Sequence, residues 1–349
     1  MLILGIESSC DETGAAIIEA SANFTKVKLL SNVIASSLLL HSKSGGIIPE
    51  NAAREQVRLI IPVIKKAIEQ CSNLAIGDID AIAVTYGPGL VGSLLVGLET
   101  AKTLSYVWNK PLIPTNHLIG HIYANFVGEI PNFKFQISNS AVPQFPAIGL
   151  IVSGGHTDLI LMNGHGRIKW LGGTRDDAAG EALDKIGRIL GLPYPGGPYI
   201  EKAALNGNPK KYNFPKPLIG SDDFDFSFSG LKTAVFREIQ TMQPLSHSAI
   251  CDISASVQKA IIDVLVKKTL KAAREYNAKS ILLGGGVAAN NKLREQFELE
   301  IENLKLKIEL FAPPKSLCTD NAAMIAAAAF FNNNTQDWRK VDANPGLYF

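Results

Sequence analysis

Residues 2–19, LILGIESSCDETGAAIIE, are the stretch that decides the fold. The pattern predicts two short apolar strands, at 2–6 and 14–19, joined by the polar turn ESSCDET. The same pattern returns at 147–162, AIGLIVSGGHTDLILM, again as strand, polar glycine turn and strand. One architectural plan is therefore predicted to occur twice.

A second repeated unit supports this interpretation. Residues 81–108 and 280–300 each predict a buried strand, a glycine turn and a helix. Gly87, Gly89 and Gly92 allow close backbone approach, and helix N-termini supply free N–H groups, although on its own this is a weak signal for an anion site. We expect an α/β fold of two lobes with mixed sheets and a central nucleotide cleft. The predicted parts are an N-terminal α/β lobe, a metal-ligand helix with its connecting loop, a C-terminal α/β lobe with a helical insertion, and a polar tail, at 1–115, 116–145, 146–332 and 333–349.

Composition narrows the class of protein. The chain has 349 residues, of which 46% are hydrophobic and 19% charged, which is typical of a globular protein with about two domains. No apolar run reaches the length of a membrane span, and the first residues are not those of a signal or transit peptide, so we expect a cytoplasmic protein without a membrane partner. The four cysteines lie far apart, which favours free thiols. A net charge of +2 predicts no large polyanion-binding surface, but leaves room for a small or shared one.

Residues 116–126, NHLIGHIYANF, are a candidate metal-binding segment. Asn116 is a plausible N-cap, and His117 and His121 are four residues apart, so both imidazoles lie on one helix face. Two ligands are too few for a site, and an isolated pair of this spacing is more often a pair of surface histidines. The segment alone leaves both interpretations open.

Other segments have similar alternatives. The hydroxyls of the 7–13 turn suit phosphate, and Asp11 and Glu12 are hypothesised proton acceptors or water-holding groups, but these are also ordinary turn residues. Glu181 and Asp184 share a helix face in a helix predicted at 177–190, which favours a solvated surface. Asp320 precedes an alanine-rich helix and is most simply its N-cap. A further helix at 49–71 is predicted to bury the stripe Val57, Ile60, Ile61, Ile64 and Ile68.

Eight segments together resemble one family. In order along the chain they are ILGIESSCDETGAAI, AVTYGPGLVGSLLVGLETAKTLS, NHLIGHIYA, LIVSGGHTDL, DDAAGEALDKIGRILGLPYPGGP, FSFSGLKTAV, GGGVAANNKLR and CTDNAAMIA. They resemble the bacterial TsaD (formerly Gcp) family of tRNA adenosine threonylcarbamoyltransferases. The resemblance implies the duplicated fold of actin, heat-shock ATPases and sugar kinases (the ASKHA group, which is ribonuclease H-like).

The resemblance also implies roles for individual residues. It implies one divalent metal ion, iron or zinc, held by His117, His121 and Asp320. It implies contacts to threonylcarbamoyl-AMP from Ile151, Val152, Ser153, Gly154, Gly155, Asp184, Gly197, Glu201 and Asn290. Three positions depart from the family pattern: Glu201 replaces a frequent aspartate, Ile119 a frequent glutamate and Gln56 a common histidine. The loop at 129–145 is longer than usual.

The implied reaction transfers threonylcarbamoyl from its mixed anhydride with AMP to the N6 amine of the adenosine 3′ of the anticodon, in tRNAs reading ANN codons. The implied partners are tRNA, a TsaB-like paralogue and a TsaE-like ATPase, with a homodimer for the chain alone. Three rival functions remain: a small-molecule kinase of the same fold, a non-catalytic nucleotide-binding partner, and a metallopeptidase. The last is least favoured, since Leu118 stands where an H-E-x-x-H motif needs glutamate.

Overall fold

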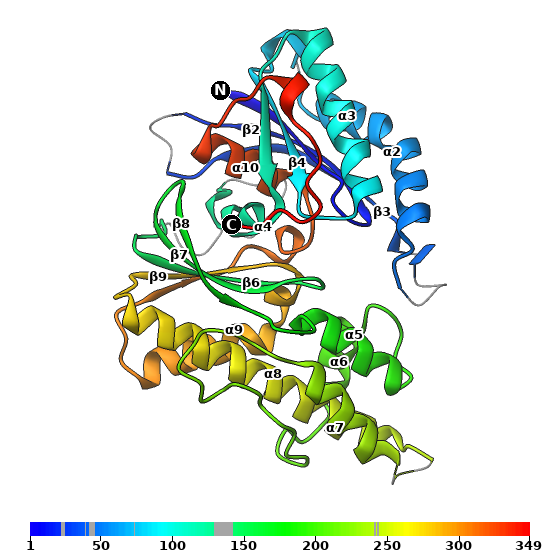
Figure 1. The fold of residues 1–349 in the computed structure, drawn as a ribbon, viewed down its shortest axis with the longest axis vertical. Helices are drawn as coiled ribbons and strands as arrows, with labels where there is room; N and C mark the ends of the chain where they lie inside the picture. The colour runs from blue at the N-terminus through cyan, green and yellow to red at the C-terminus, as the bar shows by residue number, and fades with distance from the viewer. Residues whose placement is uncertain are drawn as a thin grey trace. The chain divides into compact units, whose positions relative to one another are not determined.

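The structure is a computed structural model that describes residues 1–21, 25–38, 40–41, 46–72, 74–128, 142–240, 242 and 244–349. These residues form two compact units: Met1–Pro143 with Pro313–Phe349, and Gln144–Ala312 (Figure 1). Most of the predicted 129–145 loop lies outside the described residues. No helix in the described ranges is long and apolar enough to span a bilayer.

The first unit is built on a five-stranded mixed sheet in the order β3-β2-β1-β4-β5. The strands are β1 (Leu2–Glu7), β2 (Glu12–Glu19), β3 (Lys28–Ser36), β4 (Ala81–Gly87) and β5 (Leu112–Asn116). β2 pairs antiparallel with both β1 and β3, while β4 pairs parallel with β1 and β5. The predicted strands at 2–6 and 14–19 are confirmed, but β2 begins at Glu12, because ladder pairing extends to the end of the turn.

Helices cover both faces of this sheet. α2 (Pro49–Glu69) and α3 (Val91–Trp108) pack on one face, where Leu4, Ile6 and Val84 join the core. α10 (Ala322–Asn332) lies against β1 and β2 on the opposite face. A Cβ on Gly5 would lie 2.4 Å from the carbonyl oxygen of Ala322, so the absence of a side chain there lets α10 approach the sheet. Short helices complete the unit: η1 (Ile76–Asp78), α4 (His117–Tyr123), η2 (Ala124–Phe126), η4 (Lys315–Leu317) and η5 (Trp338–Lys340).

The predicted apolar stripe of α2 is partly wrong. The helix buries Ile60 and Ile64 together with Val63 and Ala67, which face the sheet. Val57 and Ile61 are 64% and 56% exposed. At 100° per residue, the midpoint of these two exposed residues lies about 60° around the helix from the midpoint of Ile60 and Ile64, and about 120° from that of Val63 and Ala67. They therefore fall on the outer edge of the stripe.

The units also differ from the predicted parts of the chain. Residues 313–332 were expected in the C-terminal lobe, yet α10 belongs to the first unit because it packs on β1, β2 and α4. The segment 333–349 belongs to the same unit. Its Asn344 N donates to the carbonyl oxygen of Tyr86 at 2.7 Å.

The second unit repeats the first sheet. Its strand order is β10-β9-β6-β7-β8, with β7 antiparallel to β6 and β8, and β9 parallel to β6 and β10. The strands are β6 (Ala147–Val152), β7 (Thr157–Gly164), β8 (Arg167–Gly173), β9 (Ser280–Gly284) and β10 (Glu309–Phe311). Since order and directions match those of the first sheet, the predicted duplication is confirmed.

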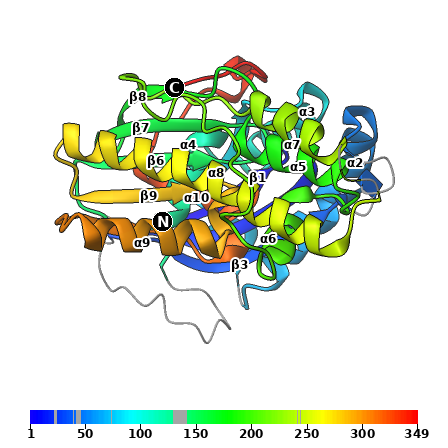
Figure 2. The same cartoon turned by 90° about the horizontal axis from the view of Figure 1, so that it is seen from below.

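The second unit carries its own helices. They are α5 (Ala179–Ile189), α6 (Gly196–Ala204), α7 (Ser229–Gln240), α8 (His247–Glu275), η3 (Gly286–Ala289) and α9 (Asn291–Asn303). α8 and α9 run along the same side of the sheet (Figures 1 and 2). Gly285 connects β9 to η3 with φ +93°, and a Cβ there would lie 2.4 Å from the carbonyl oxygen of Val152. Only glycine combines this backbone conformation with so close an approach.

Candidate metal centre and nucleotide-binding turns

The helix that carries the two histidines begins where β5 ends. The side chain of Asn116 accepts hydrogen bonds from the backbone N–H groups of Leu118 at 2.8 Å and Ile119 at 3.2 Å, so the predicted N-cap is confirmed. His117 and His121 then follow on one face, and their ring centroids are 4.6 Å apart. The helix start is therefore fixed by a cap at the end of a buried strand.

Asp320 joins the two histidines from the other end of the unit. Its Oδ1 lies 3.6 Å from Nε2 of His117 and 3.3 Å from Nε2 of His121. One ligand atom from each of the three residues lies within 4.8 Å of the others. His117 and His121 are 6% and 0% exposed, whereas the Asp320 side chain is 20% exposed, so the cluster is reached from the aspartate side.

Asp320 is not the N-cap of α10, so the simpler sequence interpretation was wrong. Asn321 occupies the cap position and accepts a hydrogen bond from Met324 N at 3.0 Å. The carboxylate one residue earlier is left to face the histidines. α4 and α10 come close because Gly120 has no side chain: a Cβ there would lie 2.8 Å from Cδ1 of Ile325.

A fourth residue, Glu7, lies behind His117. Its Oε2 is 3.2 Å from His117 Nδ1 and accepts a hydrogen bond from Thr85 Oγ1 at 2.6 Å. Its Oε1 accepts from Ser9 N at 2.5 Å. Sequence reasoning placed Glu7 in the turn without a role. The available signal was a carboxylate at the carboxyl end of a central parallel strand, where sites form.

The electrostatics of the two rings differ. Burial lowers the pKa of both imidazoles, but the carboxylates of Asp320 and Glu7 outweigh burial at His117 and raise its pKa to about 9. Burial prevails at His121 and holds its pKa below the usual value. Without an ion, a proton on His117 therefore balances the surrounding carboxylates.

The residues present fit a metal ion. Both ring nitrogens of His121 are buried; Nδ1 makes no hydrogen bond to the described residues, and Nε2 lies 3.3 Å from Asp320 Oδ1 without the alignment of a hydrogen bond. Such unsatisfied polar atoms are costly in a protein interior, and coordination of Nε2 would remove part of that cost. Two imidazoles and one carboxylate are donors that suit zinc or ferrous iron and leave coordination positions open.

Asp11 and Glu12 lie at the turn that leads from β1 into β2. Burial and the nearby Asp320 raise the pKa of Asp11. Burial is also the main cause that raises the pKa of Glu12 to about 7, although Ser36 Oγ donates to Glu12 Oε1 at 2.8 Å. Carboxyl groups with raised pKa values can exchange a proton near neutral pH.

The turn between β1 and β2 is held by hydrogen bonds from side chains of α2 and α3. Gln56 Nε2 donates to the carbonyl oxygens of Cys10 at 3.1 Å and Glu12 at 3.0 Å, and Ser93 Oγ donates to that of Cys10 at 2.9 Å. The turn is therefore rigidly supported from behind. The amide of Gln56 supplies part of this support.

In the second unit, the β6–β7 turn is an open glycine turn beside a helix start. Gly180 N, in the first turn of α5, donates to the carbonyl oxygen of Ser153 at 3.1 Å. Gly154 and Gly155 are exposed, and a Cβ on either would have no neighbour within 4 Å. Ile151 and Val152 are fully buried, so the exposed part of this segment begins at Ser153.

The remaining predicted contact residues tie neighbouring elements together. Asp184 Oδ1 accepts from Gly196 N at 2.7 Å, beside Gly197, and burial raises its pKa. Glu201 Oε1 accepts from Asn291 N at 2.8 Å. Asn290 caps α9 through Leu293 N at 3.0 Å and donates to Gln258 Oε1 at 2.9 Å.

These contacts close a ring within the second unit. Going round it, the ring passes from Ser153 to α5, from Asp184 to the start of α6, from Glu201 to the start of α9, and from Gly285 back to Val152. The nine predicted contact residues are thus brought into one connected group. Three helix starts belong to it, and helix starts present N–H groups that suit phosphate.

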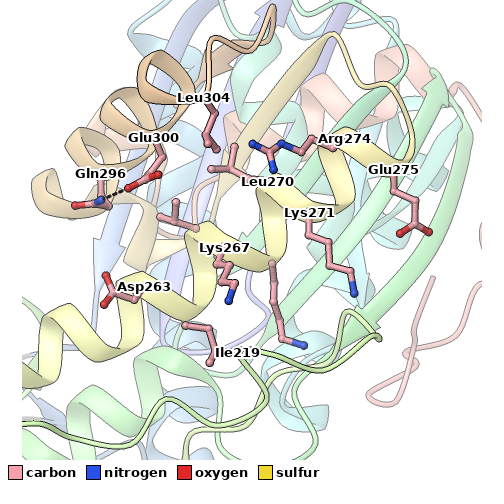
Figure 3. Close-up of a pocket in the computed structure, with 12 residues that line it drawn as sticks. Ile219, Asp263, Lys267, Leu270, Lys271, Arg274, Glu275, Gln296, Glu300 and Leu304 are labelled. Atoms are coloured by element: carbon pink, nitrogen blue, oxygen red, sulfur yellow. Dashed lines mark hydrogen bonds between the residues drawn. The ribbon is translucent and has the colours of Figure 1, made fainter.

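Cavity size does not single out this group. A cavity of about 730 Å³ lies between α8 and α9 (Figure 3). Basic Lys267, Lys271 and Arg274 line it together with acidic Glu275 and Glu300. Lys271 already donates to the carbonyl oxygen of Ser221, at 3.2 Å. None of the nine predicted contact residues lines this cavity, and its mixed charge favours no particular ligand.

Comparison with known proteins agrees with the geometry. Residues 28–327 match the family model TsaD, described as tRNA N6-adenosine threonylcarbamoyltransferase. A relative with that name from Symbiobacterium thermophilum is 51% identical over 99% of this chain and 96% of its own length. One from Moorella thermoacetica is 48% identical over 98% of this chain and 95% of its own length.

Among solved structures, full-length HypF in a phosphate- and nucleotide-bound form aligns with a TM-score of 0.59 at 12% identity. The alignment covers 95% of this chain and 46% of HypF, so it supports the fold alone. The matching family and relatives extend over nearly all of the chain. The chain therefore belongs to the TsaD family of tRNA N6-adenosine threonylcarbamoyltransferases.

Proposed function

We propose that this protein transfers the threonylcarbamoyl group from threonylcarbamoyl-AMP to N6 of the adenosine 3′ of the anticodon, in tRNAs reading ANN codons, and releases AMP. The observation that carries the proposal is the convergence of His117, His121 and Asp320 in a chain that matches the family over most of its length. These three residues come from distant segments. Burying two imidazoles against a carboxylate is costly, and a bound ion would offset that cost.

We propose one iron or zinc ion as the resident metal. When bound, it supplies Lewis acidity to a carbonyl or carboxylate oxygen of the threonylcarbamoyl group. His117 and His121 would hold it through Nε2 and Asp320 through a carboxylate oxygen. The N6 amine is a poor nucleophile, so orientation of both reactants and stabilisation of the departing phosphate must provide most of the rate enhancement.

Side chains and backbone groups of the protein would bind the AMP portion and accept the proton. The backbone of the 151–155 segment and the start of α6 at Gly197 would contact the AMP portion, and Asp184 would accept hydrogen bonds from ribose hydroxyls. Glu201 and Asn290 would act through the helix starts that they hold. Asp11 or Glu12 would accept a proton from the amine or hold a water molecule, since both carboxyl groups have raised pKa values.

The test is transfer of threonylcarbamoyl from its adenylate to unmodified tRNA, measured together with metal content. His117→Ala should lose both the ion and the transfer. His247→Ala is the matched control, because His247 is an exposed histidine at the start of α8, outside the cluster. A His117→Ala protein with full transfer activity would reject the proposal.

Product analysis separates the rival functions. AMP release that depends on tRNA supports the transferase, whereas ADP formed from ATP and a sugar would support a kinase. A metallopeptidase of the H-E-x-x-H type is disfavoured because Leu118, which is buried, takes the place of the glutamate base. Retention of all three candidate ligands argues against a non-catalytic role.

We also propose a TsaB-like paralogue and a TsaE-like ATPase as partners, with a homodimer for the chain alone. α2 and α3 pack side by side (Figure 1) and leave Val57, Ile61, Val91 and Leu95 between 44% and 64% exposed. Exposed apolar side chains on neighbouring helices are typical of a protein interface. Because tRNA is the proposed acceptor, we assign the reaction to the cytoplasm.

A further inference from the structure

We propose that Glu7 is a positioning residue: its carboxylate accepts the Nδ1–H of His117 and so presents Nε2 of that ring to the metal ion. The inference rests on the metal centre proposed above and adds a residue that lies behind the ligands. It specifies which ring nitrogen carries the proton when the site is loaded, and which side chain decides this.

The contacts of Glu7 leave it little freedom. The carboxylate is fully buried and takes hydrogen bonds from Ser9 N at 2.5 Å and Thr85 Oγ1 at 2.6 Å. Among the described residues, the only ion pair of Glu7 is with His117, whose Nδ1 lies 3.2 Å away. In the part of the chain that the structure describes, no lysine or arginine forms an ion pair with this carboxylate. A carboxylate buried in this way needs a hydrogen-bonding, charge-compensating partner, and the imidazole provides it.

The sheet holds these groups in register. β1 and β4 are parallel with Ile6 opposite Val84, so Glu7 and Thr85 follow side by side at the carboxyl ends of the two strands. β4 and β5 are parallel with Thr85 opposite Thr115, and His117 comes two residues later. Three adjacent strand ends therefore carry Glu7, Thr85 and the histidine helix. Groups on such rigid elements can orient a ring accurately.

The chemistry of the acceptor decides the tautomer. Ser9 Oγ also lies 3.1 Å from His117 Nδ1, but a hydroxyl can donate or accept and so does not determine where the proton sits. Both oxygens of Glu7 already accept hydrogen bonds, from Ser9 N and Thr85 Oγ1, so this group acts as an acceptor toward Nδ1 as well. Glu7 therefore requires hydrogen on Nδ1, which leaves the Nε2 lone pair, on the side of Asp320, for coordination.

Two substitutions at Glu7 test this role. In Glu7→Gln the shape is kept, but the amide N–H can donate to Nδ1 and favour the tautomer that carries hydrogen on Nε2. We expect cobalt affinity to fall by roughly 10- to 100-fold, as is typical for partners of metal-binding histidines. Glu7→Asp keeps an acceptor and should recover part of the affinity.

The experiment is a titration of the metal-free, full-length protein with Co²⁺, followed by visible absorption. Proton NMR of the Co²⁺-loaded protein then detects the exchangeable ring N–H signals, which the ion shifts far from other resonances. In the wild type the Nδ1–H of His117 should exchange slowly with water. In Glu7→Gln it should broaden or disappear, while a purely structural effect would leave it in place.

Gln56→Leu is the matched control, because Gln56 supports the same turn through hydrogen bonds to the carbonyl oxygens of Ser8, Cys10 and Glu12 and not through the Glu7 carboxylate. An equal loss of affinity in Gln56→Leu would overturn the inference, since turn support alone would then explain the effect. If Glu7→Gln fails to fold, Thr85→Val removes one hydrogen bond from Glu7. It should speed exchange of the His117 N–H and weaken Co²⁺ binding less.

His117→Ala separates this inference from the proposed metal centre. If His117→Ala binds Co²⁺ as tightly as the wild type, the metal centre itself is wrong. If His117→Ala loses the ion while Glu7→Gln binds with wild-type affinity and an unchanged N–H signal, the metal centre stands and the role of Glu7 is rejected. Weak binding and loss of the signal in Glu7→Gln support both.

Discussion

Oδ1 of Asp320 lies 3.3 Å from Nε2 of His121, although nearly two hundred residues separate them along the chain. The approach depends on α10 packing against α4, where Gly120 faces Ile325 without an intervening side chain. The metal-binding geometry is therefore a consequence of helix packing. This relationship leads to the first prediction.

Gly120→Val should weaken metal binding. A Cβ at this position would lie 2.8 Å from Ile325 Cδ1 and 3.3 Å from Met324 Cγ, so a branched side chain has to displace these two side chains in the packing of α10 on α4. Overpacking of this kind costs about 1–3 kcal/mol of unfolding free energy. We expect a lower Tm and weaker Co²⁺ binding. Gly77→Val is the control, because a Cβ there has no neighbour within 4 Å; equal behaviour of the two variants would contradict the packing argument.

Metal affinity should rise with pH. The pKa of His117 is raised to about 9, mainly by Asp320 and Glu7 acting against burial, so below that pH an ion must displace a proton. Apparent affinity should increase about tenfold per pH unit and level off near pH 9. Co²⁺ titrations between pH 6 and pH 9 measure the slope. A flat profile would show that His117 is already neutral.

Without metal, the free energy of unfolding should fall as the pH rises, because His117 loses its proton. The folded-state pKa of His117 lies above the unfolded value of 6.5, so its protonation favours folding fully below pH 6.5. That contribution is lost as the pH rises through about 9. Urea unfolding of the metal-free protein at these two pH values, with His117→Ala as the reference, isolates the effect of this one ring.

Glu12→Gln should reduce the pH dependence of the free energy of unfolding, here through an acidic side chain instead of a basic one. Burial raises the pKa of Glu12 from 4.5 to about 7, so the unfolded chain loses this proton at lower pH than the folded chain. Glu12 therefore favours folding below pH 4.5 and loses that contribution as the pH rises to about 7. Urea unfolding at pH 5 and pH 8 should show a smaller difference for Glu12→Gln than for the wild type. An unchanged difference would mean that Glu12 titrates normally.

Asp11→Ala should lower threonylcarbamoyl transfer without releasing the ion. Asp11 is near enough to Asp320 for each carboxylate to affect the other, yet it is not one of the three clustered residues. Transfer rate and metal content measured on one preparation test the role. Loss of the ion would instead place Asp11 among the groups that hold it, and an unchanged rate would remove it from the reaction.

Ile61→Asp should weaken association with a partner chain. Ile61 is 56% exposed on α2, so the substitution leaves the core intact while adding charge to the apolar surface beside α3. Light scattering with and without a TsaB-like paralogue measures the complex. Leu299→Asp makes the same change of an apolar residue to Asp at a position 49% exposed on α9, away from α2 and α3, and serves as the control for charge. Equal binding by wild type and Ile61→Asp would remove this surface from the interface.

The sequence by itself determined the repeated plan and the start of the histidine helix. The alternation of apolar strands with polar or glycine turns is a local pattern, and it predicted β1, β2, β6 and β7 correctly. Asn116 as N-cap was equally predictable, because capping involves residues only two or three positions apart. The strands β3 and β8 were missed, since their mixed polarity is that of half-buried edge strands.

Only the tertiary structure decided which distant residues meet. Asp320 was most simply a helix cap until Asn321 took that position and the packing of α10 on α4 brought the carboxylate to the histidines. Glu7 acquired a partner only through the register of three parallel strands. Local propensities act over a few residues, whereas the position of one strand or helix against another depends on packing and hydrogen bonding across the whole unit, and no spacing along the chain encodes that.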